Sequence, residues 1–519
     1  MSDDGVMKSV LIVGGGTAGW LTACLLAAEH GSNLDITLVE SPDVPIIGVG
    51  EGTWPSMRTT LQRIGIDEVD VLRACSASFK QGTEFVNWLY DDKPHTYYHP
   101  FSLPFDYAAT NLADYWLSSE IHAQFGEMVT PQVALMAQGR APKTEAVPPY
   151  AYQLNYGYHF DAAAFALLLT NYAIERLGVR HRQAFVTNVR RTVTGNIESI
   201  GIDDGDALTA DLFIDCTGQR ALLVGDTPWC SLTHVSPNNR ALVVQVPYHS
   251  EDAPIPSFTR AQAMDQGWIW DIGLQNRRGV GFVHNDDYSS EQDAYDRLEA
   301  YLKQHDARTL AELTPRFVRF KAGYRPQPWQ GNCVAVGLSA GFIEPLEASA
   351  IALIEQAAGM IADALPLTQS HLAQTAQDFN ARMELHWQSI VEFLKLHYVL
   401  SRRTRSEYWR MQRDTGATPE SLKIKLQRWS HRSIWHIDAP RYDELFPSAS
   451  YQYVAYGLDY RPSMQFAQRA AFRRKRAAAD AALHRVAEAI RQLEQQLPTN
   501  RELLTRLVGR ASSAQAGVA

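Results

Sequence analysis

The stretch that decides the fold is KSVLIVGGGTAGWLTACLLAAEHGSNLDITLVES, residues 8–41. It contains an apolar run, three glycines, an apolar segment of helical length and a second apolar run, which predict strand, glycine turn, helix and strand. A helix that connects two strands in this way places them parallel in one sheet. Gly14, Gly16 and Gly19 have the spacing G-x-G-x-x-G at the start of the helix. This spacing after a strand is typical of dinucleotide-binding turns.

The glycine turn also predicts its binding chemistry. Glycines permit a tight turn and a close approach of the backbone to a pyrophosphate, and the helix N-terminus offers amides with partial positive charge. Glu40 ends the second strand, where an acidic side chain accepts hydrogen bonds from an adenosine ribose. We therefore predict a dinucleotide site that includes Gly14, Gly16, Thr17, Ala18, Gly19 and Glu40.

Two later segments favour FAD over NAD. ADLFIDCTGQRALL, residues 210–223, is a strand that ends near Asp215 and Gly218, and it resembles the second strand–turn contact of flavoproteins. NCVAVGLSAG, residues 332–341, is a third strand with a turn at Gly337 and Leu338. It resembles the segment that brings a helix N-terminus to the flavin ring. Flavin hydroxylases usually carry an Asp where this chain has Leu338, so the resemblance to hydroxylases is weaker at this position.

The same turn contains Gly337, Ser339 and Gly341, which have the GxSxG spacing of the nucleophile elbow in α/β-hydrolases. An elbow needs the helix to begin at the serine, whereas Pro345, a residue favoured in a first helical turn, lies downstream. The N-terminal dinucleotide turn also has no place in a hydrolase. The hydrolase alternative is therefore disfavoured.

The composition is that of an ordinary globular protein, with 519 residues, 45% hydrophobic and 20% charged. A net charge of −9 gives no reason to expect nucleic acid or an anionic membrane as a partner. The five cysteines form no CxxC spacing, so we predict reduced, mostly buried thiols in a cytoplasmic protein. No signal peptide and no apolar run of membrane-spanning length is present. No HExxH motif or Cys/His cluster indicates a metal.

The predicted fold class is α/β. Strand-like runs dominate residues 180–290, and helical patterns follow NCVAVG, beginning with IALIEQAAGMIADAL, residues 351–365. We predict an FAD-binding, Rossmann-like core with an inserted mixed β region over residues 1–360, and a mostly α-helical, substrate-binding region over residues 361–519. The basic run RRKR, residues 473–476, is expected to be a solvated helix face.

GWIWDIGL, residues 267–274, carries two tryptophans two residues apart. In a strand, Trp268, Trp270 and Ile272 share one face while Ile269 and Asp271 lie on the other. Core packing is the usual reason for such aromatic pairs in strands.

Two further segments carry candidate catalytic residues. SASFKQGTEFVNW, residues 76–88, places Lys80 between aromatic residues, and GFIEPLEASAI, residues 341–351, places Glu344 and Glu347 near the start of an apolar helix. The simplest interpretation is a surface lysine and glutamates that favour the positive end of a helix.

Taken in order, these segments resemble the flavin-dependent tryptophan halogenase family. The resemblance covers most of the chain: GGGTAGW, IIGVGEGTWP (46–55), SFKQGTEF, DLFIDCTG, GWIWDIGL, NCVAVGLSAGFIEPLEASAI and LHYVLSRR. Members carry the signature W-x-W-x-I-P, which helps to separate them from flavin monooxygenases. Trp268, Trp270 and Ile272 match it, whereas Gly273 replaces the proline and is expected to loosen a turn there.

The resemblance implies Lys80 as the catalytic lysine and Glu347 as its partner. In the family, reduced FAD and O2 oxidise chloride or bromide to hypohalous acid, which travels to the lysine. An ammonium can donate a hydrogen bond to this oxidant, whereas a neutral amine, which requires a depressed pKa, could be chlorinated. Glu347 could orient the oxidant or accept the proton released from the ring. The implied substrate is an electron-rich aromatic compound of indole or phenol type.

The resemblance also implies the remaining site residues and partners. Halide would be held at Ser349 and Ala350, although this chain has Ala-Ser-Ala at 348–350 where relatives have Ser-Thr-Gly. Residues 48–53, with Gly50 and Glu51, would cover the flavin as a mobile strap. The implied substrate pocket contains His99, Phe101, Trp268 and Trp270. A separate NAD(P)H-dependent flavin reductase would supply reduced FAD by diffusion, and homodimers occur among relatives.

Two alternatives remain open. A flavin-dependent monooxygenase or oxidoreductase could have lost halogenation when the motif proline and the halide loop changed. A flavin-binding protein without catalysis could retain the same fold. In a halogenase, the W-x-W-x-I strand would obstruct direct approach of the substrate to the flavin, so that only the small oxidant travels.

Overall fold

The computed structural model describes residues 5–43, 50–118, 123–305, 308–439, 441, 443–463 and 470–516, with side chains for all of these except 470–472 and 510–516. The chain folds into two compact units, each built from three segments. The first unit comprises Met1–Ala77, Phe160–Leu232 and Phe320–Trp387, and the second comprises Ser78–His159, Thr233–Arg319 and Gln388–Ala519.

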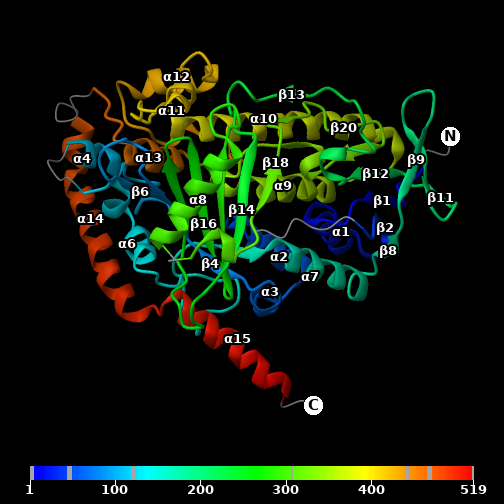
Figure 1. The fold of residues 1–519 in the computed structure, drawn as a ribbon, viewed down its shortest axis with the longest axis horizontal. Helices are drawn as coiled ribbons and strands as arrows, with labels where there is room; N and C mark the ends of the chain where they lie inside the picture. The colour runs from blue at the N-terminus through cyan, green and yellow to red at the C-terminus, as the bar shows by residue number, and fades with distance from the viewer. Residues whose placement is uncertain are drawn as a thin grey trace. The chain divides into compact units, whose positions relative to one another are not determined.

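A six-stranded sheet forms the centre of the first unit. Its order is β20-β21-β12-β1-β2-β8, and all neighbours are parallel except β20 and β21. The strands are β1 (Ser9–Val13), β2 (Asp35–Glu40), β8 (Arg180–Gln183), β12 (Leu212–Asp215), β20 (Trp329–Gln330) and β21 (Cys333–Ala335). Helix α1 (Thr17–His30) connects β1 to β2, so the predicted strand–helix–strand unit is confirmed (Figure 1).

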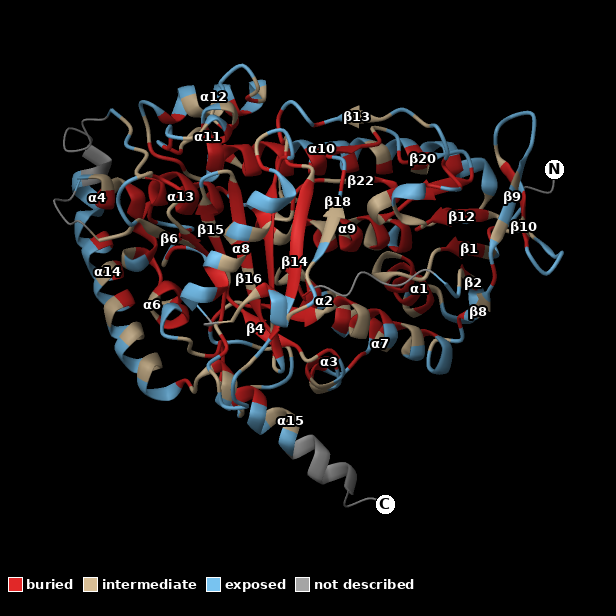
Figure 2. Cartoon of the chain, viewed as in Figure 1, coloured by how far each residue is buried: buried red, intermediate tan, exposed pale blue. Residues whose placement is uncertain are grey.

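Helices and a small sheet complete the first unit. Helix α1 packs against α7 (Ala162–Glu175) and α9 (Ser349–Asp363). The antiparallel strands β9 (Val186–Arg191), β10 (Ile197–Ile202) and β11 (Ala207–Leu208) supply Ile197, Ile200 and Ile202 to the core around Phe213. The outer parts of this small sheet are exposed (Figure 2). The remaining elements are β3 (Gly50–Gly52), α2 (Ser56–Ile64), α3 (Glu68–Ala74), β13 (Cys230–Ser231), β19 (Gly323–Tyr324) and β22 (Gly341–Phe342).

A seven-stranded sheet forms the centre of the second unit, in the order β18-β14-β17-β16-β15-β5-β6. Its strands are β5 (Gly82–Val86), β6 (Thr96–Pro100), β14 (Arg240–Pro247), β15 (Thr259–Met264), β16 (Gly267–Gly273), β17 (Arg277–His284) and β18 (Arg316–Arg319). The central strands are buried (Figure 2). Only the pairing of β5 with β15 is parallel in this sheet.

Strand β16 has the two faces that its sequence predicts. Ile269 joins the core formed with helix α8 (Glu291–His305), and the Asp271 carboxylate accepts a hydrogen bond of 2.8 Å from Tyr301 on that helix. On the other face, the rings of Trp268 and Trp270 have centroids 6.3 Å apart. The alternation is confirmed because successive side chains of a strand point to opposite sides of the sheet.

The C-terminal region is helical, as predicted. Helix α10 (Leu372–Val399) contributes residues to both units, and the second unit also contains α11 (Glu407–Gln412), α12 (Glu420–Trp429), α13 (Ser448–Gly457), α14 (Ala470–Gln496) and α15 (Asn500–Ala516). Earlier in the chain this unit contains β4 (Ser78–Lys80), α4 (Leu112–Ser118), α5 (Phe125–Val129), α6 (Pro131–Ala137) and the first three residues of β7 (Gly157–Asp161). Residues 473–476 are all exposed on α14, so the solvated helix face is confirmed.

The division into units differs from the predicted boundary at residue 360. The chain leaves the first unit after Ala77, Leu232 and Trp387, and it re-enters that unit at Phe160 and Phe320. The chain therefore passes between the units five times, and a single boundary does not describe this division. Sequence patterns report local structure and give no signal for this return of the chain.

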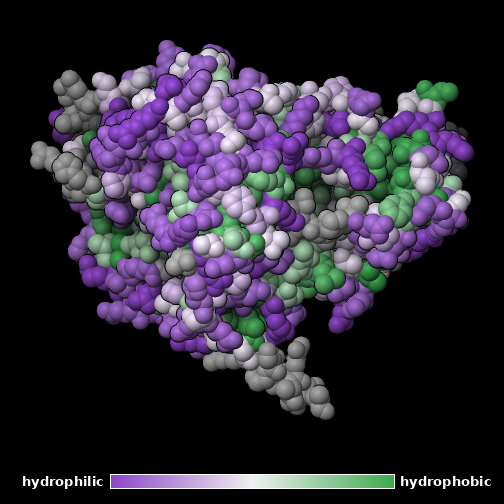
Figure 3. All heavy atoms as spheres, viewed as in Figure 1, coloured by the Kyte–Doolittle hydropathy of each residue, from purple (hydrophilic) through white to green (hydrophobic). Residues whose placement is uncertain are grey.

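The surface and the cysteine residues have the properties that the composition of an ordinary globular protein predicts. The face of the molecule in Figure 3 is predominantly hydrophilic. All five cysteines are free thiols and four of them are buried, as predicted. Within the described parts of the chain, no helix is both long and apolar enough to cross a membrane.

Candidate functional site

The glycine turn of the first unit has the shape that its sequence predicts. Gly14 has a φ of +112°, and a Cβ added there would lie 2.2 Å from the carbonyl oxygen of Cys216. A Cβ on Gly19 would lie 1.9 Å from the carbonyl oxygen of Gly14. Only glycine therefore fits at these two positions, because any side chain would collide with backbone.

The start of α1 is suited to an anion. Gly16 is the N-cap residue of α1 and provides no side-chain cap, and nothing lies within 4 Å of a Cβ added to it. No side chain caps the amides at the start of the helix, and they carry the partial positive charge of the helix N-terminus. The turn fits a pyrophosphate, as the predicted dinucleotide site requires.

Glu40 lies at the edge of this turn. Its carboxylate is hydrogen-bonded to Nε2 of His181 at 2.7 Å, and both side chains are about one-fifth exposed. The His181 ring contacts Trp20 on α1, with the ring centroids 5.1 Å apart. The exposed part of the carboxylate remains accessible to a ribose hydroxyl. No sequence pattern had indicated His181.

The Asp215 side chain stabilises the turn of the second predicted cofactor segment. Its fully buried carboxylate accepts hydrogen bonds from the amides of Thr217, Leu223 and Val224 at 2.7–3.0 Å, and from the Thr217 hydroxyl at 2.7 Å. Its carbonyl oxygen accepts from the amide of Val336 at 2.9 Å. The four donors to the carboxylate all belong to the turn itself, so the Asp215 side chain shapes the turn that contains Gly218.

The third predicted segment lies against the first. Gly337 has a φ of +77°, and a Cβ added there would lie 2.8 Å from Cβ of Ala18 on α1. The fold thus brings the predicted cofactor residues Gly14, Ala18 and Gly337 together in one unit. Ser339 is buried, and its hydroxyl donates to the carbonyl oxygens of Asp215 and Val336. Ser339 is therefore a structural residue and not an exposed nucleophile, which removes the hydrolase alternative.

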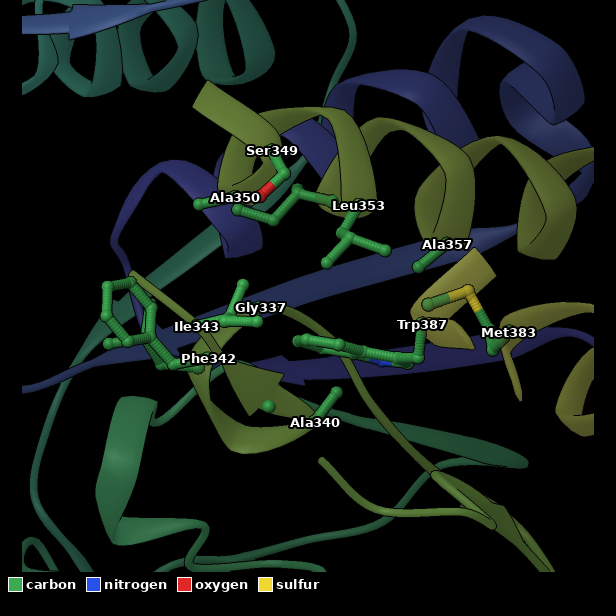
Figure 4. Close-up of a pocket in the computed structure, with 13 residues that line it drawn as sticks. Gly337, Ala340, Phe342, Ile343, Ser349, Ala350, Leu353, Ala357, Met383 and Trp387 are labelled. Atoms are coloured by element: carbon green, nitrogen blue, oxygen red, sulfur yellow. The ribbon is translucent and has the colours of Figure 1, made fainter. Parts of the chain in front are cut away.

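An apolar pocket adjoins this segment (Figure 4). The turn that begins at Gly337 and Leu338 forms one wall, and residues 349–357 of α9 form the opposite wall, with Leu353 and Ala357 directed toward Trp387. The complete lining is Gly337, Leu338, Ala340, Gly341, Phe342, Ile343, Ser349, Ala350, Leu353, Ile354, Ala357, Met383 and Trp387. The predicted cofactor residue Leu338 and the predicted halide residues Ser349 and Ala350 therefore border one pocket.

The backbone before α9 is strained at the predicted catalytic glutamate. Glu347 (φ 65°, ψ 10°) and Ala348 (φ 54°, ψ 45°) are consecutive non-glycine residues in the left-handed region. Such a conformation costs about 1–3 kcal/mol for each residue and is concentrated at functional sites. Ala348 is the N-cap of α9 and gives it no side-chain cap, so the helix begins with uncapped amides at Ser349 and Ala350. These amides fit a small anion.

A cluster missed by the sequence patterns surrounds this turn. The indole Nε1 of Trp54 donates a hydrogen bond of 2.7 Å to the carbonyl oxygen of Glu347. The hydroxyls of Ser56 and Thr60 on α2 donate to the Glu355 carboxyl group on α9 at 3.2 and 2.7 Å. Burial raises the pKa of Glu355 to about 8, so this carboxyl group is protonated at neutral pH.

The predicted flavin strap is described only in part. Gly50 is buried in β3, and Glu51 beside it has a pKa raised to about 7 by burial. Residues 46–49 lie outside the described residues.

Lys80 lies in the second unit and is fully buried. It ends β4, pairs with Gly157 of β7 and is 1% exposed. Its Nζ lies 5.3 Å from the centroid of the Phe101 ring. The interpretation of Lys80 as a surface lysine is therefore wrong. A buried lysine is rare, and a buried polar group beside an aromatic ring is a candidate functional residue.

His159 is a neighbour of Lys80 that the sequence did not indicate. It lies opposite Ser78 on β7, is completely buried, and its Nε2 is 2.8 Å from the Thr259 hydroxyl. Burial, together with the positive charge of Lys80, holds the pKa of His159 well below its usual range. The ring is therefore neutral and contributes no second positive charge beside Lys80.

Two of the four predicted substrate residues, His99 and Phe101, lie near the end of β6. Strand β6 approaches Gly82 closely, since a Cβ there would lie 2.4 Å from the carbonyl oxygen of His99. Nε2 of His99 is 2.9 Å from the Ser450 hydroxyl on α13, and its ring centroid is 5.5 Å from that of Phe393. Phe101 follows the strand, is half-buried and borders Lys80. The fold therefore brings Phe101 to Lys80.

The two tryptophans of β16 are packed against their own unit. Trp268 is 1% exposed, and its ring lies 6.2 Å from that of Trp88. Trp270 is 9% exposed and covers Gly281, where a Cβ would lie 2.2 Å from the indole. Packing accounts for Trp268, and close approach to a glycine of the next strand accounts for the position of Trp270.

The expectation that Gly273 loosens a turn is wrong. Gly273 ends strand β16, where it pairs with Arg278, and its carbonyl oxygen accepts a hydrogen bond of 2.5 Å from the Ser78 hydroxyl. A Cβ there would lie 2.9 Å from the Tyr248 hydroxyl and 3.1 Å from Cδ of Pro256. Gly273 therefore lies in a closely packed strand end, where a larger side chain would require its neighbours to shift.

In the described ranges, no three His, Cys, Asp or Glu side chains are placed to hold a metal ion together.

Comparisons with known proteins agree with this geometry. The family model described as tryptophan halogenase matches residues 9–473. Tryptophan 6-halogenase SttH of Streptomyces toxytricini is 32% identical over 463 residues, covering 84% of this chain and 86% of that protein. Tryptophan 7-halogenase RebH of Lentzea aerocolonigenes is 31% identical over 463 residues, covering 85% and 84%. The crystal structure of a tryptophan halogenase from Shewanella frigidimarina superposes with a TM-score of 0.93 at 42% identity, and 98% of each chain is covered.

Proposed function

The chain belongs to the flavin-dependent tryptophan halogenase family, and from this premise we propose that it halogenates an electron-rich aromatic compound of indole or phenol type with chloride or bromide. The observation that carries the proposal is the complete burial of Lys80 with its Nζ at 5.3 Å from the Phe101 ring. Burial of a charged lysine lowers the stability of the folded protein. A catalytic role would explain why a lysine is retained at this buried position.

We propose that the first unit binds FAD. The amides at the start of α1 would hold the pyrophosphate, Glu40 the ribose, and the backbone of the turns at Gly218 and Gly337 the rest of the cofactor. The Asp215 carboxylate is engaged by its own turn, so its contribution to binding is to fix that turn. When bound and reduced, FAD with O2, a proton and a halide ion yields hypohalous acid, water and oxidised FAD.

Lys80 is proposed to deliver the oxidant to the ring. As an ammonium, it donates a hydrogen bond to the oxygen of hypohalous acid and makes the halogen more electrophilic. As a neutral amine, it would instead form a nitrogen–halogen bond and release water. In either case the aromatic carbon gains the halogen and loses a proton, so the site also needs a base.

Glu347 is proposed as the group that orients the oxidant or accepts the proton released from the ring. The amides of Ser349 and Ala350, which start α9 without a side-chain cap, are proposed to hold the halide. Gly50 and Glu51 are proposed to belong to a strap over the flavin. Trp270 and Trp268 are proposed to obstruct direct contact between substrate and cofactor.

The second unit is proposed to hold the aromatic substrate. His99 and Phe101 present rings near Lys80 and α13, and aromatic rings with a few polar groups are the usual lining of such pockets. SttH and RebH are named for halogenation of tryptophan, so tryptophan is the first indole to test. We also propose a cytoplasmic homodimer that receives reduced FAD by diffusion from a separate NAD(P)H-dependent reductase.

One assay tests the function. Purified protein is supplied with FAD, a flavin reductase, NADH, O2 and either chloride or bromide, and an indole and phenol panel that includes tryptophan is analysed by mass spectrometry. Halogenated products that require halide support the proposal. Hydroxylated products that form without halide would support the monooxygenase alternative, which the Ala-Ser-Ala sequence of the halide loop at 348–350 leaves open.

A further inference from the structure

The peptide group between Glu347 and Ala348 is held at both of its polar atoms. Its carbonyl oxygen accepts a hydrogen bond of 2.7 Å from the indole Nε1 of Trp54. Its N–H, on Ala348, donates to the carbonyl oxygen of Pro345 at 3.1 Å. These two contacts fix the orientation of the peptide plane, because a flip of the plane would break both.

This peptide plane connects two residues in the left-handed region. Glu347 has a φ of 65° and Ala348 has a φ of 54°, and neither is a glycine. The chain would relax from such a conformation unless surrounding contacts hold it. The hydrogen bond from Trp54 comes from a residue 293 positions earlier in the sequence, so it is a tertiary restraint on the turn.

Trp54 is itself held in place by the next helix. Helix α2 begins two residues later at Ser56, and the hydroxyls of Ser56 and Thr60 donate to the Glu355 carboxyl group, which is 5% exposed on α9. Residues 54–60 therefore contact both the strained turn and the second turn of α9. A donor anchored in this way restrains the turn more than one on a free side chain would.

We propose that Trp54 is a positioning residue for Glu347: its indole N–H holds the Glu347–Ala348 peptide in the orientation that directs the Glu347 carboxylate and the first amides of α9. This proposal rests on the proposed function, in which Glu347 and those amides act on the oxidant and the halide. Trp54 touches neither substrate nor halide in this role, and it acts only through the turn.

The test compares Trp54→Phe with a matched control. Phenylalanine keeps an aromatic ring but removes the donor. The control is Trp329→Phe in the same unit, where the buried indole donates at 3.1 Å to the carbonyl oxygen of Gly331, which lies outside the turn. Trp54→Phe is expected to lower kcat for halogenation by about three- to tenfold, the effect of one hydrogen bond. Trp329→Phe is expected to lower Tm without changing kcat.

A double-variant cycle separates positioning from packing. In an Ala348→Gly background, the left-handed conformation at position 348 carries little strain, so the loss caused by Trp54→Phe should be smaller than in the wild-type background. A packing defect at Trp54 would give the same loss in both backgrounds, and that result would overturn the proposal.

A crystal structure of the cofactor-free Trp54→Phe protein gives a readout that does not depend on activity. We expect the Glu347–Ala348 peptide to leave its present orientation, with φ of Ala348 outside the left-handed region. Retention of both left-handed residues in that variant would also overturn the proposal. If the wild-type protein does not halogenate any compound, the proposed function fails, whereas this crystallographic comparison still decides whether Trp54 holds the turn.

Discussion

The Nζ atom of Lys80 lies 5.3 Å from the centroid of the Phe101 ring, in a part of the second unit where Lys80 is 1% exposed. A second buried lysine of this unit offers a comparison. Lys143 is 2% exposed, lies 5.1 Å from the Tyr156 ring centroid and donates to the Tyr156 hydroxyl at 3.0 Å. The two lysines have similar surroundings, but only Lys80 is a predicted catalytic residue.

Replacement of Lys80 by Ala should abolish halogenation and leave FAD binding intact, because the lysine lies outside the unit proposed to bind FAD. Halogenated product is measured by mass spectrometry, and FAD affinity by quenching of flavin fluorescence. Lys143→Met is the matched control and should lower Tm while retaining turnover. Activity in Lys80→Ala would contradict the proposed mechanism.

His159→Gln should make the protein less sensitive to acid. In the folded protein the pKa of His159 is held well below its usual range by burial and by Lys80, whereas the unfolded chain has a histidine pKa of about 6.5. Below that pH the unfolded state binds a proton that the folded state does not, so the free energy of unfolding falls as pH falls, by at most about 1.4 kcal/mol per pH unit. The Tm of His159→Gln should therefore rise relative to wild type between pH 7 and pH 5. An identical pH dependence in both proteins would show that His159 is not buried and neutral.

Glu355→Gln should change the pH dependence of Tm in the direction opposite to that of His159→Gln. Burial raises the pKa of Glu355 to about 8, so the folded protein keeps a proton that the unfolded chain releases above about pH 4.5. This contribution to stability is present below pH 4.5 and is lost as pH rises toward 8, by up to about 1.4 kcal/mol per pH unit. Glutamine is neutral at every pH, so the variant should gain in Tm over wild type from pH 5 to pH 8. Thermal unfolding across this range measures the difference, and a gain at acid pH instead would contradict the assignment.

Asp215→Asn should weaken FAD binding through the turn at Gly218. The Asp215 carboxylate accepts from three amides and one hydroxyl, and an amide NH2 group in its place would leave donors unpaired, at a cost of about 1–3 kcal/mol. The matched control lies before the other end of β12, where Asp211 accepts from the amides of Lys8 and Ser9. Both variants should lower Tm, but only Asp215→Asn should raise the Kd for FAD. Equal effects on the two Kd values would mean that Asp215 does not shape the binding turn.

Restoring the family motif with Gly273→Pro should destabilise this protein. Even Gly273→Ala should cost about 1–3 kcal/mol, because the added Cβ would lie 2.9 Å from the Tyr248 hydroxyl and 3.1 Å from Cδ of Pro256. Tyr248→Phe should relieve part of the cost of Gly273→Ala. Gly359→Ala on α9, where nothing lies within 4 Å of the added Cβ, should be neutral or stabilising. Urea unfolding of the four variants gives the comparison, and a stable Gly273→Pro protein would refute it.

The sequence predicts the elements that local patterns determine. The apolar runs and glycines of residues 8–41 predict β1, α1 and β2, because each element there follows from neighbouring residues. The alternation in residues 267–273 likewise predicts which face of β16 holds Trp268 and which holds Ile269. The family resemblance directed attention to Lys80, whose burial the lysine's own sequence context did not determine.

Long-range contacts escape such patterns. Trp54 and Glu347 are 293 residues apart, and no periodicity indicates that an indole donates to that carbonyl oxygen. Nothing in the sequence around His159 distinguishes it from other polar residues in strands. Only the pairing of β7 with β4 brings it to Lys80. Gly273 was interpreted as a flexible residue because the sequence does not show that Tyr248 and Pro256 fill the space of a side chain.

The interleaving of the two units along the chain restricts how relatives can be recombined. The chain changes unit after residues 77, 159, 232, 319 and 387, so a chimaera with a single crossover divides the interior of at least one unit between two parents. Five crossovers at these positions would exchange one complete unit and keep the internal contacts of both. Chimaeras of halogenase genes with one random crossover should therefore be mostly unfolded. Exchange of the three segments 78–159, 233–319 and 388–519 together should transfer the complete second unit.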